Sequence, residues 1–146
     1  SGDAARGCCR VGPRMRSPRA TARAAALVWA TVILVTGVLP TQGVVRTVSN
    51  GHVSVATVPA HFLSYMVLAI LTAAAIGGWG RVSWSGAALA FVLATALGGA
   101  VELVQAPLPY RDAQAVDVLT NAAGAAAGLV ALSCAARVER RRARRG

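Results

Sequence analysis

The sequence predicts an all-α fold, a four-helix transmembrane bundle with both termini cytoplasmic, and three observations lead to this prediction. First, 55% of the 146 residues are hydrophobic and only 14% are charged, whereas a soluble domain carries about 25% charge. Second, the uncharged residues form four long stretches. Third, the net charge of +10 comes from arginines that cluster near the two ends of the chain. A chain of this length has room for one domain.

The four uncharged stretches define the predicted helices. They lie before Arg46, between Arg46 and Arg81, between Arg81 and Glu102, and after Asp117. A membrane-spanning helix needs about 20 mainly apolar residues, and it forms because lipid offers the backbone amides no hydrogen-bond partners. The predicted helices cover residues 24–39, 58–79, 85–105 and 112–136, with prolines at positions 40, 59, 107 and 109 near their boundaries.

The distribution of arginine predicts the orientation. Positively charged flanking segments stay on the cytoplasmic side of a membrane. We therefore assign residues 1–22 to a basic, disordered, cytoplasmic N-terminal tail, 23–136 to the membrane domain and 137–146 to a basic cytoplasmic C-terminal tail. This organisation predicts a multi-pass protein of the plasma membrane. The alternative is that the first apolar stretch is a cleaved signal peptide, although no small-x-small cleavage site follows it closely. Met15 resembles a natural start.

Several local patterns add detail to the predicted bundle. Gly124 and Gly128 form a small-xxx-small pattern that lets another helix approach closely. The Asn50-Gly51 dipeptide suits either a type I′ hairpin turn or an irregular outer loop. Trp79 is expected at the membrane interface, as is Trp84. The three cysteines match no disulfide or zinc pattern.

Polar residues of three predicted helices converge on the outer end of the bundle. The second helix begins there, the third ends there and the fourth begins there. Burying a polar group in lipid is costly unless the group is paired or faces a cavity. We therefore expect a functional pocket at this end. Its members are His61 and Tyr65 of the second helix, Glu102 and Gln105 of the third, Asp117 and Asn121 of the fourth, and Arg111 of the preceding loop.

Candidate roles follow from the chemistry of these side chains. His61, Glu102 and Asp117 are candidates for catalytic proton transfer, since an imidazole titrates near neutral pH. The candidate ligand-binding residues are Tyr65, Gln105, Arg111 and Asn121. The guanidinium of the loop arginine suits a phosphate or carboxylate.

Structural roles are the alternatives at several of these positions. Asp112 is typical of a helix N-cap. Asn121 could simply bridge two helices, and Tyr65 could be an interfacial aromatic residue. The spacing of the polar residues gives no support for a metal site, and no cofactor motif is present.

The pattern of these residues resembles the VanZ-like family of bacterial integral membrane proteins. The resemblance covers roughly residues 28–133. Its motifs are His61-Phe62-x-x-Tyr65-x-x-Leu68, Glu102-x-x-Gln105, Pro109-x-Arg111 and Asp117-x-x-x-Asn121-x-x-Gly124-x-x-x-Gly128. Family members often carry an acid-lysine pair where this chain has Thr57 and Val58.

The resemblance implies a protein of the bacterial cell envelope. The founding member of the family is associated with low-level resistance to teicoplanin, a lipoglycopeptide. The implied function is an outward-facing polar site for a lipid-linked wall precursor or a glycopeptide-type ligand, in contact with membrane lipids. A membrane hydrolase or transferase that modifies an anionic lipid or wall precursor is the first alternative, and the sequence leaves catalysis open.

Two further functions are ranked lower. A small drug transporter would need a membrane-embedded acid reachable from both sides, but here the acids cluster at one end of the bundle. The arginine-rich tails could bind nucleic acid on charge alone. Adjacent anionic lipid explains them better, so no nucleic-acid partner is expected.

Overall fold

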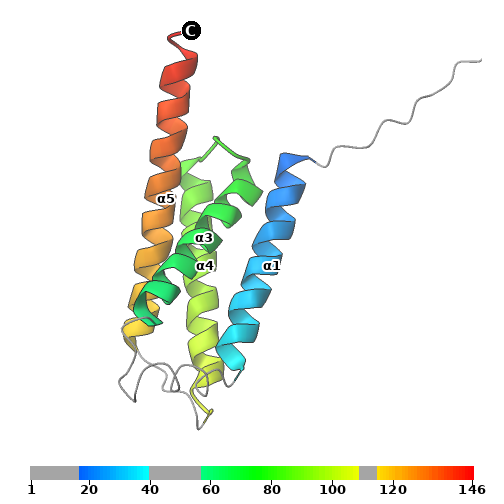
Figure 1. Ribbon diagram of the computed structural model, residues 1–146, viewed down its shortest axis with the longest axis vertical. Helices are drawn as coiled ribbons and strands as arrows, with labels where there is room; N and C mark the ends of the chain where they lie inside the picture. The colour runs from blue at the N-terminus through cyan, green and yellow to red at the C-terminus, as the bar shows by residue number, and fades with distance from the viewer. Residues whose placement is uncertain (1–16, 40–56, 109–114) are drawn as a thin grey trace, which may run out of the picture.

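The computed structural model describes residues 17–39, 57–108 and 115–146, and these ranges are helical apart from short turns (Figure 1). The helices are α1 (Pro18–Val38), α3 (Thr57–Gly77), α4 (Trp84–Gln105) and α5 (Ala115–Ala143). All four are long and apolar enough to cross a membrane. The predicted four-helix transmembrane fold is therefore confirmed. The segment around Asn50-Gly51 lies outside the described residues.

Two helices extend further than predicted. The side-chain oxygen of Ser17 caps α1 by accepting a hydrogen bond from the amide of Ala20 (3.2 Å), and Pro18 occupies the first turn, where its missing N–H costs nothing. Residues 18–22 are thus helical and not part of a disordered tail. Likewise, α5 continues past residue 136 to Ala143, because arginine and alanine favour helix and cations stabilise the negative C-terminal end of a helix.

Short turns set the direction of the helices. Gly78 and Gly80 both have positive φ angles, 85° and 76°, which side-chain-bearing residues rarely adopt. The amide of Gly78 donates to the carbonyl of Ala74 (2.8 Å) and ends α3. The hydroxyl of Ser83 then accepts from the amide of Gly86 (3.1 Å) and starts α4. The chain thereby reverses within a few residues.

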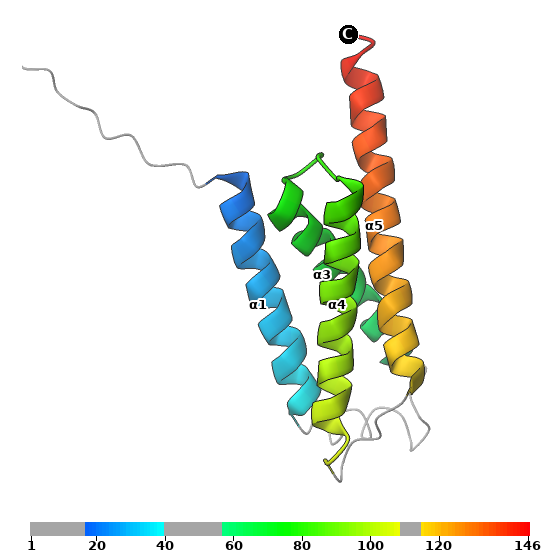
Figure 2. The same ribbon diagram turned by 180° about the vertical axis from the view of Figure 1, so that it is seen from behind.

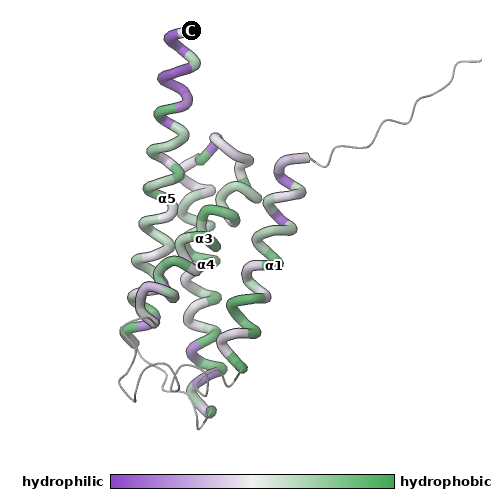
Figure 3. Tube along the Cα trace, in the orientation of Figure 1, coloured by the Kyte–Doolittle hydropathy of each residue, from purple (hydrophilic) through white to green (hydrophobic). Residues whose placement is uncertain are grey.

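The bundle consequently has two distinct ends (Figures 1 and 2). The start of α1, the turn between α3 and α4, and the end of α5 lie at the same end of the bundle. We call this the arginine-rich end, with Arg19, Arg23, Arg81 and the arginines of residues 137–145. The start of α3, the end of α4 and the start of α5 form the opposite, polar end. Colouring by hydropathy shows hydrophilic segments towards both ends and apolar segments between them (Figure 3).

Side-chain size sets how closely the helices pack. The interior consists largely of alanines that expose at most 2% of their surface, namely Ala69, Ala73, Ala90, Ala94 and Ala125. Large apolar side chains face outward instead. Leu27, Val28, Leu103, Leu119 and Val130 expose between 64% and 77% of their surface. An apolar exterior around a small-residue interior is typical of a bundle surrounded by lipid.

Helices α3 and α5 run in the same direction and touch backbone to backbone. A Cβ atom added at Gly124 would lie 2.1 Å from the carbonyl oxygen of Phe62, and one added at Gly128 would lie 2.5 Å from that of Met66. No side chain fits at either position. The predicted small-xxx-small packing is therefore confirmed, and it fixes the register of α5 along α3.

Helix α1 is attached to α3 by side-chain hydrogen bonds to the backbone. The indole N–H of Trp29 donates to the carbonyl of Ser64 (2.9 Å). The guanidinium of Arg19 donates to the carbonyl of Gly77 (3.1 Å). This second contact places a cation at the negative C-terminal end of α3.

Substitutions at the two contact glycines test the backbone packing. We expect Gly124→Ala or Gly128→Ala to lower the stability of the bundle by about 1–3 kcal/mol, the usual cost of overpacking a tight interface. Thermal unfolding in detergent, followed by circular dichroism, measures the effect. Gly99→Ala is the matched control, because a Cβ there meets nothing within 4 Å. Equal melting temperatures for all three variants would contradict the packing.

Candidate functional site

The buried polar side chains gather at the polar end of the bundle. Within the ranges that the structure describes, three polar residues are buried: Glu102, Gln105 and Asn121, which expose 7%, 5% and 1% of their surfaces. All three are among the residues predicted to form the site. The buried polar residues that the structure describes therefore lie at one end of the bundle, whereas the buried hydroxyl of Thr95 lies midway along α4.

His61 and Asn121 meet across the interface between α3 and α5. The Nδ1 atom of His61 lies 3.2 Å from Oδ1 of Asn121. Because the amide oxygen can only accept, Nδ1 carries the proton in this pair, and Nε2 of a neutral ring is left with its lone pair. The imidazole is partly exposed. The glycine contacts between the helices place these two side chains opposite each other.

Asn121 also packs against α4. A Cβ atom added at Gly98 would lie 2.9 Å from Nδ2 of Asn121 and 3.2 Å from Cε1 of Tyr65. Tyr65 exposes 1% of its surface, so the alternative of an interfacial aromatic residue is wrong. Gly98 of α4 leaves room for its ring, because a side chain there would contact it. Among the described residues, Nδ2 of Asn121 has no hydrogen-bond partner.

Glu102 lies one turn after Gly98 on the same face of α4. Both of its carboxylate oxygens are buried. A carboxylate inside a bundle is costly unless it is neutralised or stabilised by its surroundings. Its position on the inner face of α4 makes it the central acid of the polar end.

Gln105 joins α4 to the end of α1. Its Nε2 atom donates to the carbonyl oxygen of Gly37 (2.8 Å). A Cβ atom added at Gly37 would lie 2.8 Å from Val101 and 3.2 Å from that amide nitrogen. Gln105, which was predicted to bind a ligand, therefore uses its side-chain nitrogen in a hydrogen bond between two helices. Through this bond α1 covers one side of the polar end.

The remaining predicted residues are placed only in part. Asp117 lies in the first turn of α5, one turn before Asn121, and is partly exposed. There it gains from the positive end of the helix dipole. Arg111 and Asp112 lie outside the described residues, so their predicted roles stay predictions. In the described ranges no three His, Cys, Asp or Glu side chains could together hold a metal ion.

Two glycines of the site were not predicted from the sequence. Gly98 makes room for Tyr65 and Asn121, and Gly37 accepts the hydrogen bond of Gln105. A signal for the first existed, because Ala90, Ala94 and Gly98 repeat every four residues and lead to Glu102. The sequence held no comparable signal for Gly37, since only the packing of α1 brings this residue near α4.

No family model, no curated protein and no solved structure matches the chain. An intramembrane group of buried polar and ionisable residues is a reason to propose a functional site. The catalytic and ligand-binding roles of its members remain predictions.

The hydrogen bond between His61 and Asn121 predicts one tautomer of the imidazole. We expect neutral His61 to carry its proton on Nδ1, because the partner oxygen only accepts. Nitrogen-15 chemical shifts of labelled histidine measure this, with His52 replaced to leave one signal. Asn121→Asp retains an acceptor and should keep the tautomer, whereas Asn121→Leu should lose the preference. A proton found on Nε2 in the unsubstituted protein would contradict the assignment.

Proposed function

We propose that the chain is a VanZ-like multi-pass membrane protein of the bacterial cell envelope. Its polar end is an outward-facing binding site for a lipid-linked wall precursor or a glycopeptide-type ligand such as teicoplanin. The observation that carries this proposal is the gathering of His61, Glu102, Gln105 and Asn121 at one end of an otherwise apolar bundle. These four belong to the motifs on which the resemblance rests.

The described side chains of the polar end suit a ligand that carries several hydrogen-bonding groups. The imidazole of His61 and the carboxylate of Asp117 are partly exposed at the polar end. Glu102 and Asn121 lie deeper. Wall precursors and glycopeptides offer phosphates or carboxylates together with amides and sugars, which such side chains bind by hydrogen bonds. Arg111, which precedes α5, would supply the cation for the anionic group.

Catalysis at the same site is the second candidate, and one observation favours it. Asn121 holds the Nδ1 side of His61, so Nε2 is positioned to accept a proton from a bound hydroxyl or water. Holding an imidazole in one tautomer is how general bases are oriented in many hydrolases. In this alternative the protein is a hydrolase or transferase acting on an anionic lipid or wall precursor.

Binding by purified protein tests the proposed site. We expect an undecaprenyl-diphosphate-linked muropeptide or teicoplanin to bind the protein in phosphatidylcholine nanodiscs. His61→Ala and Asp117→Asn should each weaken binding about tenfold or more, since a hydrogen bond to a charged group contributes on the order of 1.5–3 kcal/mol. Both residues are partly exposed, so these variants should fold.

The control for charge is Glu139→Gln, which neutralises an acid at the arginine-rich end. Glu102→Gln is its matched partner at the polar end and should weaken binding. Equal affinities of these two variants, with both folded, would contradict a site at the polar end. If neither the muropeptide nor teicoplanin binds, the proposed class of ligand is wrong. Release of a cleaved or transferred product would favour the enzyme.

Accessibility of single cysteines tests the proposed orientation. In a variant whose own cysteines are replaced, Leu108→Cys should react with an impermeant maleimide added to intact cells, because it follows α4 at the polar end. Arg81→Cys and Arg140→Cys, at the arginine-rich end, should react only after permeabilisation. The reverse pattern would place the polar end in the cytoplasm and contradict the proposal.

A further inference from the structure

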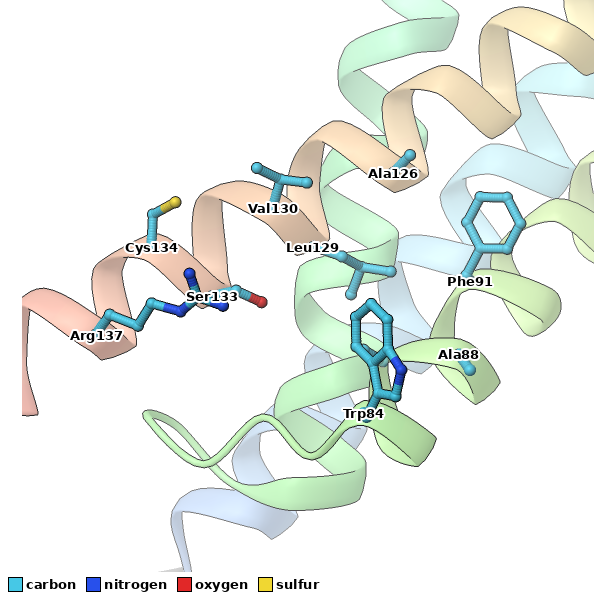
Figure 4. Close-up of a pocket in the computed structure, with 10 residues that line it drawn as sticks. Trp84, Ala88, Phe91, Ala126, Leu129, Val130, Ser133, Cys134 and Arg137 are labelled. Carbon is cyan, nitrogen blue, oxygen red and sulfur yellow. The ribbon is translucent and has the colours of Figure 1, made fainter.

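An apolar groove runs between α4 and α5 in the half of the bundle that adjoins the arginine-rich end (Figure 4). It has a volume of about 450 Å³. Ala87 and Ala88 of α4 and Ala126 of α5 are among its lining residues, and their short side chains leave space between the helices. Phe91 and Leu129 line it as well. None of the predicted site residues lines this groove.

The polar members of the groove all belong to one end of it. Along α5 the lining changes from Ala126 and Val130 to Ser133, Cys134 and finally Arg137. Figure 4 shows the side chain of Arg137 lying back along α5 towards Ser133. The groove therefore has an apolar length and a cationic, hydrogen-bonding end.

The length of the groove corresponds to one leaflet of a bilayer. From Ala126 to Arg137 the helix rises roughly 16 Å at about 1.5 Å per residue, and half of the hydrocarbon core is about 15 Å thick. Trp84, which begins α4, exposes 92% of its surface at the cationic end of the groove. An indole at that position is typical of the level of the lipid headgroups.

The surroundings of the groove favour a lipid chain as its occupant. Ala126 and Val130 of its lining are exposed, so the groove opens onto the outside of the bundle. In a membrane the outside of the bundle is lipid, and an extended acyl chain is thin enough to lie along the short side chains of the lining.

The positive charge at the end of the groove favours a lipid with an anionic headgroup. The planar guanidinium of Arg137 can bind a phosphate through two parallel hydrogen bonds, and the hydroxyl of Ser133 can donate a third. Arg141 and Arg142 follow on the same helix and attract anionic lipid. The Nε–H group of Arg140 donates a hydrogen bond to the carbonyl of Ala136 within α5 (3.2 Å).

We propose that the groove between α4 and α5 binds one anionic phospholipid of the surrounding bilayer. One acyl chain lies along the alanines, and the headgroup phosphate binds Arg137 and Ser133. This site is distinct from the polar end and lies in the opposite leaflet. It does not depend on the function proposed for the polar end, because it requires only that the bundle is surrounded by lipid.

Native mass spectrometry of the protein released from detergent micelles tests the lipid site. Phosphatidylglycerol and phosphatidylcholine with identical acyl chains are the two probes. We expect one retained phosphatidylglycerol, with phosphatidylcholine bound about fivefold more weakly, the effect of one favourable cationic contact. Arg137→Gln should remove this preference, whereas Arg137→Lys should keep part of it. Ala126→Phe should fill the groove and abolish binding of both lipids.

Matched variants control for net charge and for side-chain size. Arg144→Gln removes the same charge outside the groove, and Ala123→Phe adds the same ring at another exposed position of α5. Both should bind phosphatidylglycerol within about twofold of the unsubstituted protein, since neither residue lines the groove. Circular dichroism confirms that each variant is folded.

Three outcomes would overturn the proposal. The first is equal retention of the two lipids by the unsubstituted protein, which would leave a groove without headgroup selectivity. The second is unchanged binding by folded Arg137→Gln and Ala126→Phe. The third is a dimer that Ala126→Phe dissociates, because this would assign the groove to a second copy of the chain.

Discussion

The close approach of α3 and α5 is the contact on which the rest of the structure depends. At Gly124 and Gly128 the backbone of α5 lies directly against carbonyl oxygens of α3, so the two helices cannot slide past each other without a steric clash. In lipid there is little hydrophobic force between helices, and association relies on such tight packing. The register fixed in this way sets His61 opposite Asn121, and it brings the polar end together.

A second constraint is the separation of the two ends. The buried polar residues lie at one end, whereas the cations that contact the backbone or adjoin the apolar groove lie at the other. Polar groups in the middle of the bundle would have to be desolvated without water nearby. At the ends they can reach water, headgroups or each other. The two proposed binding sites use these two different environments, one between the helices at the polar end and one open to lipid.

Much of the fold follows from the sequence because the constraint of the bilayer is simple. Uncharged stretches of sufficient length predict the helices, and their order predicts which ends of the helices come together. The helix ends were less predictable. The N-cap of Ser17 and the helix-forming arginines extend α1 and α5 into segments assigned to tails. Local capping and propensity decide such boundaries, and hydropathy does not measure them.

The sequence by itself determined the number of spanning helices and the end at which the polar residues gather, since both follow from charge, length and direction along the chain. Only the tertiary structure decided how these residues pair. In the structure Asn121 is paired with His61, and the buried ring of Tyr65 packs against Gly98. The side chain of Gln105 connects α4 to α1 by a hydrogen bond. Rotation and crossing of packed helices set these contacts. They depend on where small side chains meet across an interface, which periodicity within one helix does not reveal.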